Sequence, residues 1–238
     1  MGDRALDVHY LGRLSYLEAW SLQKDLVAQR KAGEIEDTLL LLEHDPVVTL
    51  GRDGRQDNLR TDENGLKARG VELVESDRGG DVTFHGPGQV VGYPIIDLRP
   101  DCKDVRRYVR HLEQTMIDTV AEYGLTADRL QGSPGVWLSE PYRKIGAIGA
   151  RISRWVTHHG FALNVNTDLR YFDLIVPCGI ADKGVTSIEQ EVGARISMIE
   201  VMESLATNLA KQLERRLVAA ETVLSDTERM TQNRERLS

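Results

Sequence analysis

The sequence has only two cysteines, Cys102 and Cys178, and no long apolar run. Two cysteines cannot form the disulfide framework of a small secreted protein, so we expect a reducing, cytoplasmic location. No apolar stretch approaches the ~20 residues that a membrane span needs. The N-terminus carries acidic residues where a secretory signal has an apolar segment. We therefore expect no membrane partner.

The sequence also lacks an excess of positive charge. Its formal net charge is −7, from 37 acidic and 30 basic residues. Nucleic-acid binding needs a basic surface that neutralises phosphates, so we expect no nucleic-acid partner. The 238 residues, 41% of them hydrophobic, are enough for a domain with a sizeable core.

Helix signals lie near both ends and in the middle of the chain. A capping box at Ser15–Glu18 opens a helix that ends at Gly33, with Leu17 on its apolar stripe. A second helix is expected over about 104–123. Another capping box at Ser197–Glu200 opens a third, with Ile199 facing inward.

Strand-like runs cluster between these helices. They cover 38–43, 47–50, 71–74, two strands within 81–98, and then 136–138, 144–152 and 156–165. Because the strands cluster instead of alternating strictly with helices, we expect an α+β fold, a catalytic domain with helices flanking a mixed sheet. The apolar period fades after Val218, which predicts a single domain over 1–218 and a polar tail over 219–238.

A cysteine and a lysine form the candidate catalytic pair. Pro177 and Gly179 flank Cys178 and favour an exposed turn. A thiol is nucleophilic as its thiolate, and a nearby ammonium group such as that of Lys144 favours this form, especially in an apolar setting. On the residues alone, Cys178 fits a small buried hydrophobe equally well, and Lys144 fits a strand-edge lysine that reaches water.

Two further segments combine glycine with polar residues. In 78–89, adjacent glycines allow backbone N–H groups to approach a ligand, with an arginine and a histidine beside them. In 157–165, His158 and His159 are adjacent on an expected strand and should point to opposite faces, so we expect no shared metal site. His159, beside Gly160, is the one expected to face a pocket and is a candidate acid–base group.

These segments, in this order, closely resemble the lipoyl(octanoyl) transferases, octanoyl-[acyl carrier protein]:protein N-octanoyltransferases. The likeness covers about Leu39 to Glu189 and implies the catalytic fold shared with biotin and lipoate protein ligases. By this resemblance, Cys178 is the acyl-thioester nucleophile, and Lys144 lowers its pKa and takes part in acid–base steps. The matching substrate contacts are Arg78, Gly79, Gly80, Asp81, Val82, Thr83, Phe84, His85, Ala147, Ile148, Gly149, Gly160, Phe161 and Ala162.

The resemblance implies transfer of an octanoyl or lipoyl group from acyl carrier protein to a specific lysine, the first step of protein lipoylation. The implied acceptors are lipoyl domains of 2-oxoacid dehydrogenases and the glycine-cleavage H protein. This chemistry requires no metal and no other cofactor, and we expect a monomer. The alternative is an ATP-dependent lipoate or biotin protein ligase on the same fold, against which Cys178 argues. An acyl-carrier-binding protein and a thioesterase are further alternatives.

Overall fold

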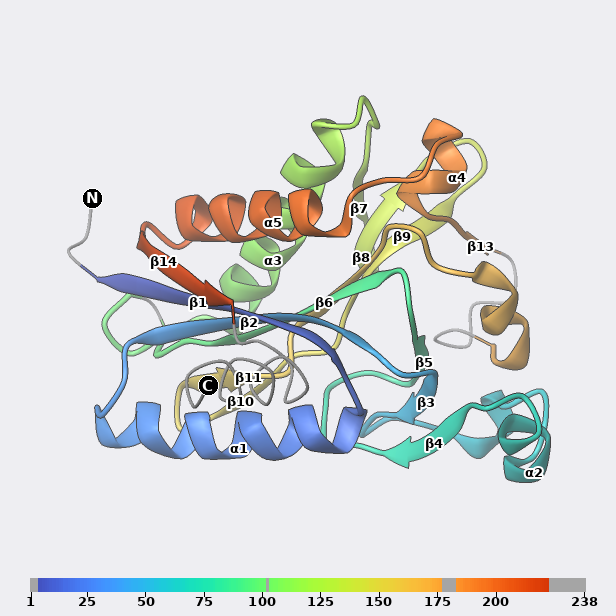
Figure 1. The fold of residues 1–238 in the computed structure, drawn as a ribbon, viewed down its shortest axis with the longest axis horizontal. Coiled ribbons are helices and arrows are strands. Elements are labelled where there is room, and N and C mark those ends of the chain that lie inside the picture. Colours follow the sequence, from blue (N-terminus) through green and yellow to red (C-terminus); the bar gives the residue numbers. More distant parts are fainter. Residues whose placement is uncertain (1–3, 102, 177–182, 223–238) are drawn as a thin grey trace, which may run out of the picture.

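The computed structural model describes residues 4–101, 103–176 and 183–222. A large mixed sheet crosses the centre of the molecule (Figure 1). This confirms the predicted fold class. The strand order is β14 (Arg216–Thr222), β1 (Ala5–Leu14), β2 (Asp37–His44), β6 (Gln89–Ile95), β12 (Phe161–Asn164), β9 (Arg143–Ile148), β8 (Ser133–Leu138) and β7 (Asp128–Leu130), with β13 (Gly184–Val185) also paired to β9.

Helices cover both faces of this sheet. Helices α3 (Val105–Ala121) and α5 (Met198–Gln212) lie on one face, and α1 (Tyr16–Ala32) lies on the other (Figure 1). The largest core cluster fills the space under α3 and α5, where Met116 and Leu205 pack against strand residues such as Leu163. No helix in the described part of the chain is both long and apolar enough to cross a membrane.

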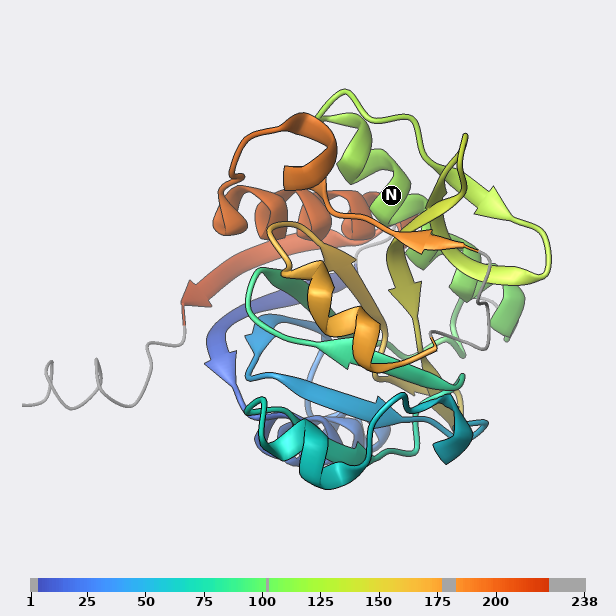
Figure 2. The same cartoon turned by 90° about the vertical axis from the view of Figure 1, so that its right-hand side faces the viewer.

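A small second sheet packs beside the first. Its strands lie in the order β4 (Glu72–Glu75), β3 (Val47–Leu50), β5 (Val82–His85), next to the short helix α2 (Glu63–Lys67). Figure 2 shows the 3₁₀ helix η2 (Leu169–Leu174) beside β5, where Phe84 stacks on Tyr171 with ring centroids 4.7 Å apart. The turn Gly86-Pro87-Gly88 separates β5 from β6, the two strands expected within 81–98, and carries the chain from the small sheet to the large one.

The remaining elements are short. They are η1 (Gln56–Asn58), β10 (Arg151–Ser153), β11 (Val156–His158) and α4 (Ile188–Val192). The two strands β10 and β11 form a separate hairpin.

The predicted capping box of α1 is confirmed, whereas in α5 Ser197 is the N-cap but only the bond from the N–H of Glu200 to its side chain is present. Ser15 and Glu18 form the capping box of α1, and Gly33 ends this helix at φ 79°.

Two burial predictions are wrong. Leu17 is 50% exposed and Ile199 is 48% exposed. In α1 the buried stripe begins one residue earlier, at Tyr16, so Leu17 falls on the outer face.

The sequence analysis missed the first and last strands. Strand β1 pairs in parallel with both β2 and β14, so its partners start more than 30 and more than 200 residues away. Strand β14 ends at Thr222, four residues beyond Val218, where we placed the start of the tail. Residues 223–238 lie outside the described part of the chain.

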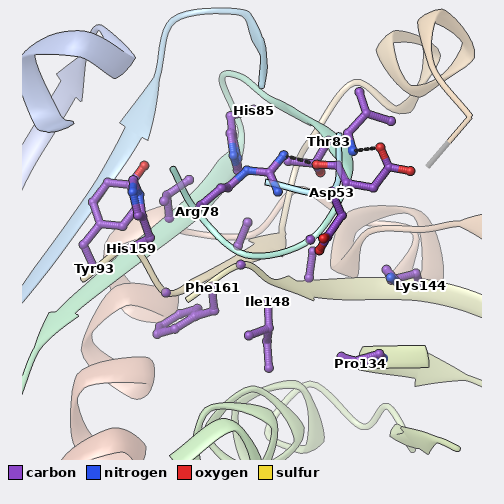
Figure 3. Close-up of a pocket in the computed structure, with 18 of the residues that line it drawn as sticks. Asp53, Arg78, Thr83, His85, Tyr93, Pro134, Lys144, Ile148, His159 and Phe161 are labelled. Carbon is purple, nitrogen blue, oxygen red and sulfur yellow. Dashed lines mark hydrogen bonds between the residues drawn. The ribbon is translucent and has the colours of Figure 1, made fainter. Parts of the chain in front are cut away.

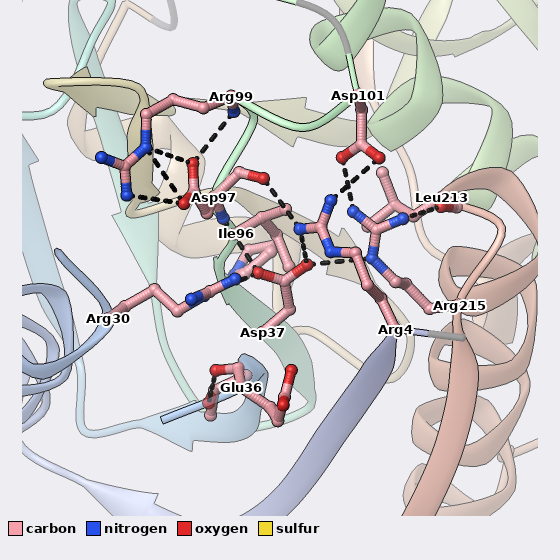
Figure 4. A network of polar contacts seen from close by, with 12 residues as sticks. Arg4, Arg30, Glu36, Asp37, Ile96, Asp97, Arg99, Asp101, Leu213 and Arg215 are labelled. Atoms are coloured by element: carbon pink, nitrogen blue, oxygen red, sulfur yellow. Dashed lines mark hydrogen bonds and ion pairs between the residues drawn. The ribbon is translucent and has the colours of Figure 1, made fainter. Parts of the chain in front are cut away.

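A buried carboxylate joins four elements at one end of the sheet (Figure 4). Asp37 is fully buried, and its oxygens accept hydrogen bonds from the guanidinium groups of Arg4 (2.7 Å), Arg30 (2.9 Å) and Arg215 (2.9 Å). The main-chain N–H of Asp97 donates a fourth, at 2.9 Å. These residues come from the starts of β1, β2 and β14 and the last turn of α1, so the cluster fixes where the missed strands begin.

We predict that Asp37→Ala lowers the free energy of unfolding by about 3–5 kcal/mol, because it leaves buried guanidinium groups without their shared carboxylate. Urea unfolding measures this change. The matched control is Asp57→Ala, which removes the exposed pair with Arg55 and should leave stability nearly unchanged. Equal effects of the two substitutions would contradict the importance given to the Asp37 cluster.

Candidate active site

A cavity of about 390 Å³ lies where β5 and the loop before it face β6, β12 and β9 (Figure 3). This volume falls within the range of small-molecule pockets. Of the candidate residues, those that line it are Arg78, Gly80, Asp81, Val82, Thr83, His85, Lys144, Ala147, Ile148, Gly149, His159, Gly160, Phe161 and Ala162. Gly79 and Phe84 do not line it, and Cys178 lies outside the described residues.

Small residues on neighbouring strands form the floor of the cavity. The pairings Ala162 with Val91 and Ala162 with Ala147 place these three residues in one row across β6, β12 and β9. Gly149 and Gly160 lie beside this row, and the N–H of Gly149 donates to the carbonyl of Gly160 at 2.8 Å. Because these side chains are absent or short, the sheet surface leaves room for an apolar ligand.

A β-bulge turns Lys144 toward the cavity. Side chains alternate between faces along a strand, so Lys144 and Ala147, three residues apart, should face opposite ways. The register with β8 shifts, however, between Val136 opposite Gly146 and Trp137 opposite Lys144. The extra residue, Ile145, packs in the core on the helix side. The bulge therefore brings Lys144 to the cavity face, as bulges beside functional sites often do.

The Lys144 amine lies over an aromatic ring at the cavity rim. Its Nζ is 4.7 Å from the centroid of Trp137, which is nearly fully buried. The negative face of an indole ring attracts an ammonium group and favours its charged form. The main chain of Lys144 also accepts a hydrogen bond from the N–H of Thr186, at 2.9 Å. The amine is therefore attached to a rigid part of the sheet.

Arg78 fixes the glycine-rich loop that forms one wall. Its guanidinium is nearly buried and donates to the carbonyl oxygens of Thr49 (2.6 Å) and Asp81 (2.6 Å), tying the loop to both β3 and β5. The loop also needs close backbone contacts: a Cβ at Gly51 would lie 2.2 Å from the carbonyl oxygen of Gly80, itself at φ 81°. The arginine therefore has a structural role besides lining the cavity.

Four rings close the end of the cavity away from Lys144, and we call Tyr16, His85, Tyr93 and His159 the ring wall. The ring centroids of Tyr93 and His159 are 6.1 Å apart, and Tyr16 stacks at 6.4 Å from His159 and 6.1 Å from His85. Figure 3 shows Tyr93 and His159 at one end of the cavity and Lys144 at the other.

Hydrogen bonds behind the ring wall hold these side chains in place. Tyr16 Oη is 2.7 Å from Ser76 Oγ, and His85 Nδ1 is 2.7 Å from Gln89 Oε1. His44 Nδ1 lies 2.9 Å from a carbonyl oxygen, which only accepts, so its Nδ1–H donates. Its Nε2 then accepts from the hydroxyl of Tyr93 at 2.6 Å.

Burial keeps the ring wall uncharged near neutral pH. It lowers the pKa of His44 to about 4 and the pKa of His85 to about 3, and it raises the pKa of Tyr93. Burial, His158 and the nearby cations of Arg78 and Arg151 hold the pKa of His159 below its ordinary value. The end of the cavity is thus lined by neutral rings.

The prediction that His158 and His159 face opposite sides is wrong. Strand β11 ends at His158, and His159 adopts a left-handed backbone conformation at φ 51°, which breaks the strand alternation. Both rings therefore approach Asp77: His159 Nε2 donates to it at 2.7 Å, and His158 Nε2 lies 3.9 Å away. These three side chains are near enough to share a metal ion, although Arg151 already forms an ion pair with Asp77.

Sequence reasoning missed several lining residues. They are Tyr16, Asp53, Val91, Tyr93, Gly132, Ser133 and Pro134. Tyr93 lies within 89–95, next to the glycine-rich string, and Asp77 immediately precedes Arg78. Extending that string by a few residues in each direction would have included both.

The comparisons with known proteins agree with this geometry. Residues 15–210 match the family described as lipoyl protein ligase A/B catalytic domain. An octanoyltransferase of Koribacter versatilis is 54% identical over 207 residues, covering 85% of this chain and 82% of the relative. An octanoyltransferase of Chloroflexus aggregans is 49% identical over 218 residues, covering 91% and 99%. Among solved structures, a lipoate-protein ligase A bound with ATP has the same fold, with TM-score 0.73, 18% identity and coverage of 98% and 94%.

The buried histidines predict a loss of stability in mild acid. Their folded-state pKa values lie below the ordinary 6.5, so the unfolded chain binds protons that the folded chain does not. The contribution of these two histidines to the free energy of unfolding is complete above pH 6.5. It decreases as the pH falls, down to about pH 4 for His44 and about pH 3 for His85. We expect urea unfolding at pH 5 to give a free energy at least ~2 kcal/mol below that at pH 7.5.

The variant His44→Gln serves as the control, because it removes one of these titrating groups. Its free energy of unfolding should decrease less between pH 7.5 and pH 5 than that of the unmodified protein. A stability that does not change over this range would show that the rings of the wall take up protons freely in the folded state.

Proposed function

The chain belongs to the family of lipoyl protein ligase A/B catalytic domains and is an octanoyltransferase, and we propose that it carries the octanoyl group as a thioester on Cys178. The observation that supports this mechanism is a largely apolar slot with Lys144 at one end and uncharged rings at the other (Figure 3). A slot of this kind suits a fatty chain whose carbonyl carbon reacts beside that amine.

The residues on either side of the Cys178 peptide support its placement in the reaction. Before it, the N–H of Val176 donates to the carbonyl of Asn58 at 2.8 Å, and the Asn58 side chain binds Asp81 of the cavity wall. After it, Val185 in β13 is the direct partner of Lys144 in β9. The peptide between Val176 and Val185 is therefore attached at both ends to residues that line the cavity or contact its lining.

In the proposed first step, the thiolate of Cys178 attacks the thioester carbon of octanoyl-acyl carrier protein. The positive charge of Lys144 favours the thiolate over the thiol. A new carbon–sulfur bond forms to Cys178 as the bond to the carrier sulfur breaks. The departing carrier thiolate takes a proton from Lys144, which leaves Lys144 neutral.

In the second step, the neutral amine of the acceptor lysine attacks the Cys178 thioester. The carbon–nitrogen bond forms, the bond to Cys178 breaks, and the amine proton passes to Lys144. The ion pair of thiolate and ammonium is thereby restored. Of the two candidate proton acceptors, we favour Lys144 over His159, because His159 lies at the other end of the cavity and its Nε2–H is bound to Asp77 (Figure 3).

The proposed partners follow from this chemistry. The donor is an acyl carrier protein that presents octanoate as a thioester, and the acceptors are lipoyl domains and the glycine-cleavage H protein. The scheme uses thioester energy, so ATP is not consumed. An amide is less reactive than a thioester, and this difference drives the second step.

We predict that incubation with octanoyl-acyl carrier protein, without ATP, adds the mass of one octanoyl group to the protein. Intact-protein mass spectrometry measures the adduct. Cys178→Ser should abolish it, and Lys144→Ala should slow its formation by at least about tenfold, since the thiolate loses its cation. Lys144→Arg should form the adduct faster than Lys144→Ala, because the charge is kept.

The matched control for the nucleophile is Cys102→Ser, which should form the adduct as the unmodified protein does. An adduct that persists in Cys178→Ser, or amide formation that requires ATP, would overturn the thioester mechanism. Release of free octanoate without amide product when an acceptor protein is present would identify a thioesterase instead.

A further inference from the structure

We propose that the ring of Tyr93, with His159 beside it, ends the acyl slot and sets the length of fatty chain that the enzyme accepts. This inference rests on the proposed function and assigns a specificity-determining residue to the same cavity. It follows from the direction of the slot, its length and the rigidity of its far end.

The slot runs from Lys144 along the small residues of the sheet toward Tyr93. Ala147 and Ala162 form its floor in the middle, and Gly149 and Gly160 continue the floor toward the far end. In the row of these glycines, the floor is interrupted by the Tyr93 ring of the neighbouring strand β6, which Figure 3 shows at the end of the cavity opposite Lys144. A chain attached near Lys144 therefore extends freely until it meets this ring.

The length of the slot matches a chain of moderate size. The register aligns Gly92 and Ile148 with the same residue, Phe161, so five residues of β9 separate Lys144 from the row that contains Tyr93. One of them is the extra residue of the bulge, so the separation along the strands is four ladder steps, roughly 13 Å at about 3.3 Å per residue. An extended octanoyl chain, with seven carbon–carbon bonds of ~1.5 Å in a zigzag, is about 9 Å long. The remainder is occupied by the Lys144 side chain at one end and the Tyr93 ring at the other.

The far end of the slot cannot easily yield. Tyr93 is 3% exposed, its hydroxyl is held by His44, and its ring contacts that of His159. His159 is 1% exposed and is held by Asp77. Displacing either ring would break a buried hydrogen bond and leave a buried polar group without its partner, which opposes the entry of a longer chain.

Because these two rings are uncharged, they can also contact the terminal methyl group of a fatty chain. Both the tyrosine and the histidine remain neutral near pH 7, as described above. A neutral ring face can contact the end of a hydrocarbon chain without the desolvation penalty of a charged group. The wall therefore stops the chain without repelling it.

The test is a competition among acyl carrier proteins that bear hexanoyl, octanoyl, decanoyl and dodecanoyl groups in equal amounts. Mass spectrometry gives the ratio of adducts on the intact protein. In Tyr93→Leu, the ratio of dodecanoyl to octanoyl adduct should rise at least about tenfold, because one methylene of fit changes selectivity by this order. In Ala162→Val, which raises the floor, the ratio of hexanoyl to octanoyl adduct should rise instead.

Tyr93→Phe is the matched control, because it keeps the ring and removes only the bond to His44. It should keep octanoyl as the preferred group and raise the ratio of dodecanoyl to octanoyl adduct less than Tyr93→Leu does. Unchanged ratios in both Tyr93→Leu and Ala162→Val, with the octanoyl adduct still formed, would overturn this inference and leave the proposed function intact. Absence of every adduct on the unmodified protein would overturn both. If Tyr93→Leu does not fold, as judged by circular dichroism, the Ala162→Val ratio decides.

Discussion

The buried guanidinium of Arg78 is the interaction on which the cavity depends. It connects the loop 77–81 to the carbonyl of Thr49 in β3 and so fixes this loop to the small sheet. The same loop packs closely against the chain just after β9 of the large sheet, since a Cβ on Gly79 would lie 2.9 Å from the carbonyl of Ala150. One arginine thus sets the distance between two sheets, and the acyl slot is the space that remains between them.

The local parts of the fold were predictable because local physics determines them. Capping residues and a left-handed glycine fixed both ends of α1, and β3 has the predicted bounds. Strands β1 and β14 were missed because they are stabilised by partners far along the chain: β1 pairs with β2 and β14, and both strands start at the Asp37 cluster. Neither strand carries a turn signal that marks it in the sequence, and pairing across the whole chain has no local pattern.

In the candidate site, too, some features were predicted from the sequence and others depend on contacts between distant parts of the chain. Fourteen of the sixteen candidate residues that lie in the described chain line the cavity, and most of them were implied by the family resemblance, not read from the local pattern of residues. Two geometric features were not readable. The bulge that turns Lys144 inward depends on a register shift with β8, and the break at His159 depends on a positive φ. In both places tertiary contacts override the alternation of side chains along a strand. Predictions from sequence periodicity assume that this alternation holds.

The two ends of the slot have opposite electrostatic character, and this contrast suits acyl transfer. At one end an amine lies over Trp137; at the other, burial keeps His85 and Tyr93 uncharged. In the proposed mechanism, a fatty chain that fills the space between them expels water, which strengthens the coupling of the Lys144 ammonium to the thiolate of Cys178. Expelled water also cannot hydrolyse a thioester. The same apolar filling therefore both activates the nucleophile and protects its product until an amine arrives, which separates a transferase from a thioesterase.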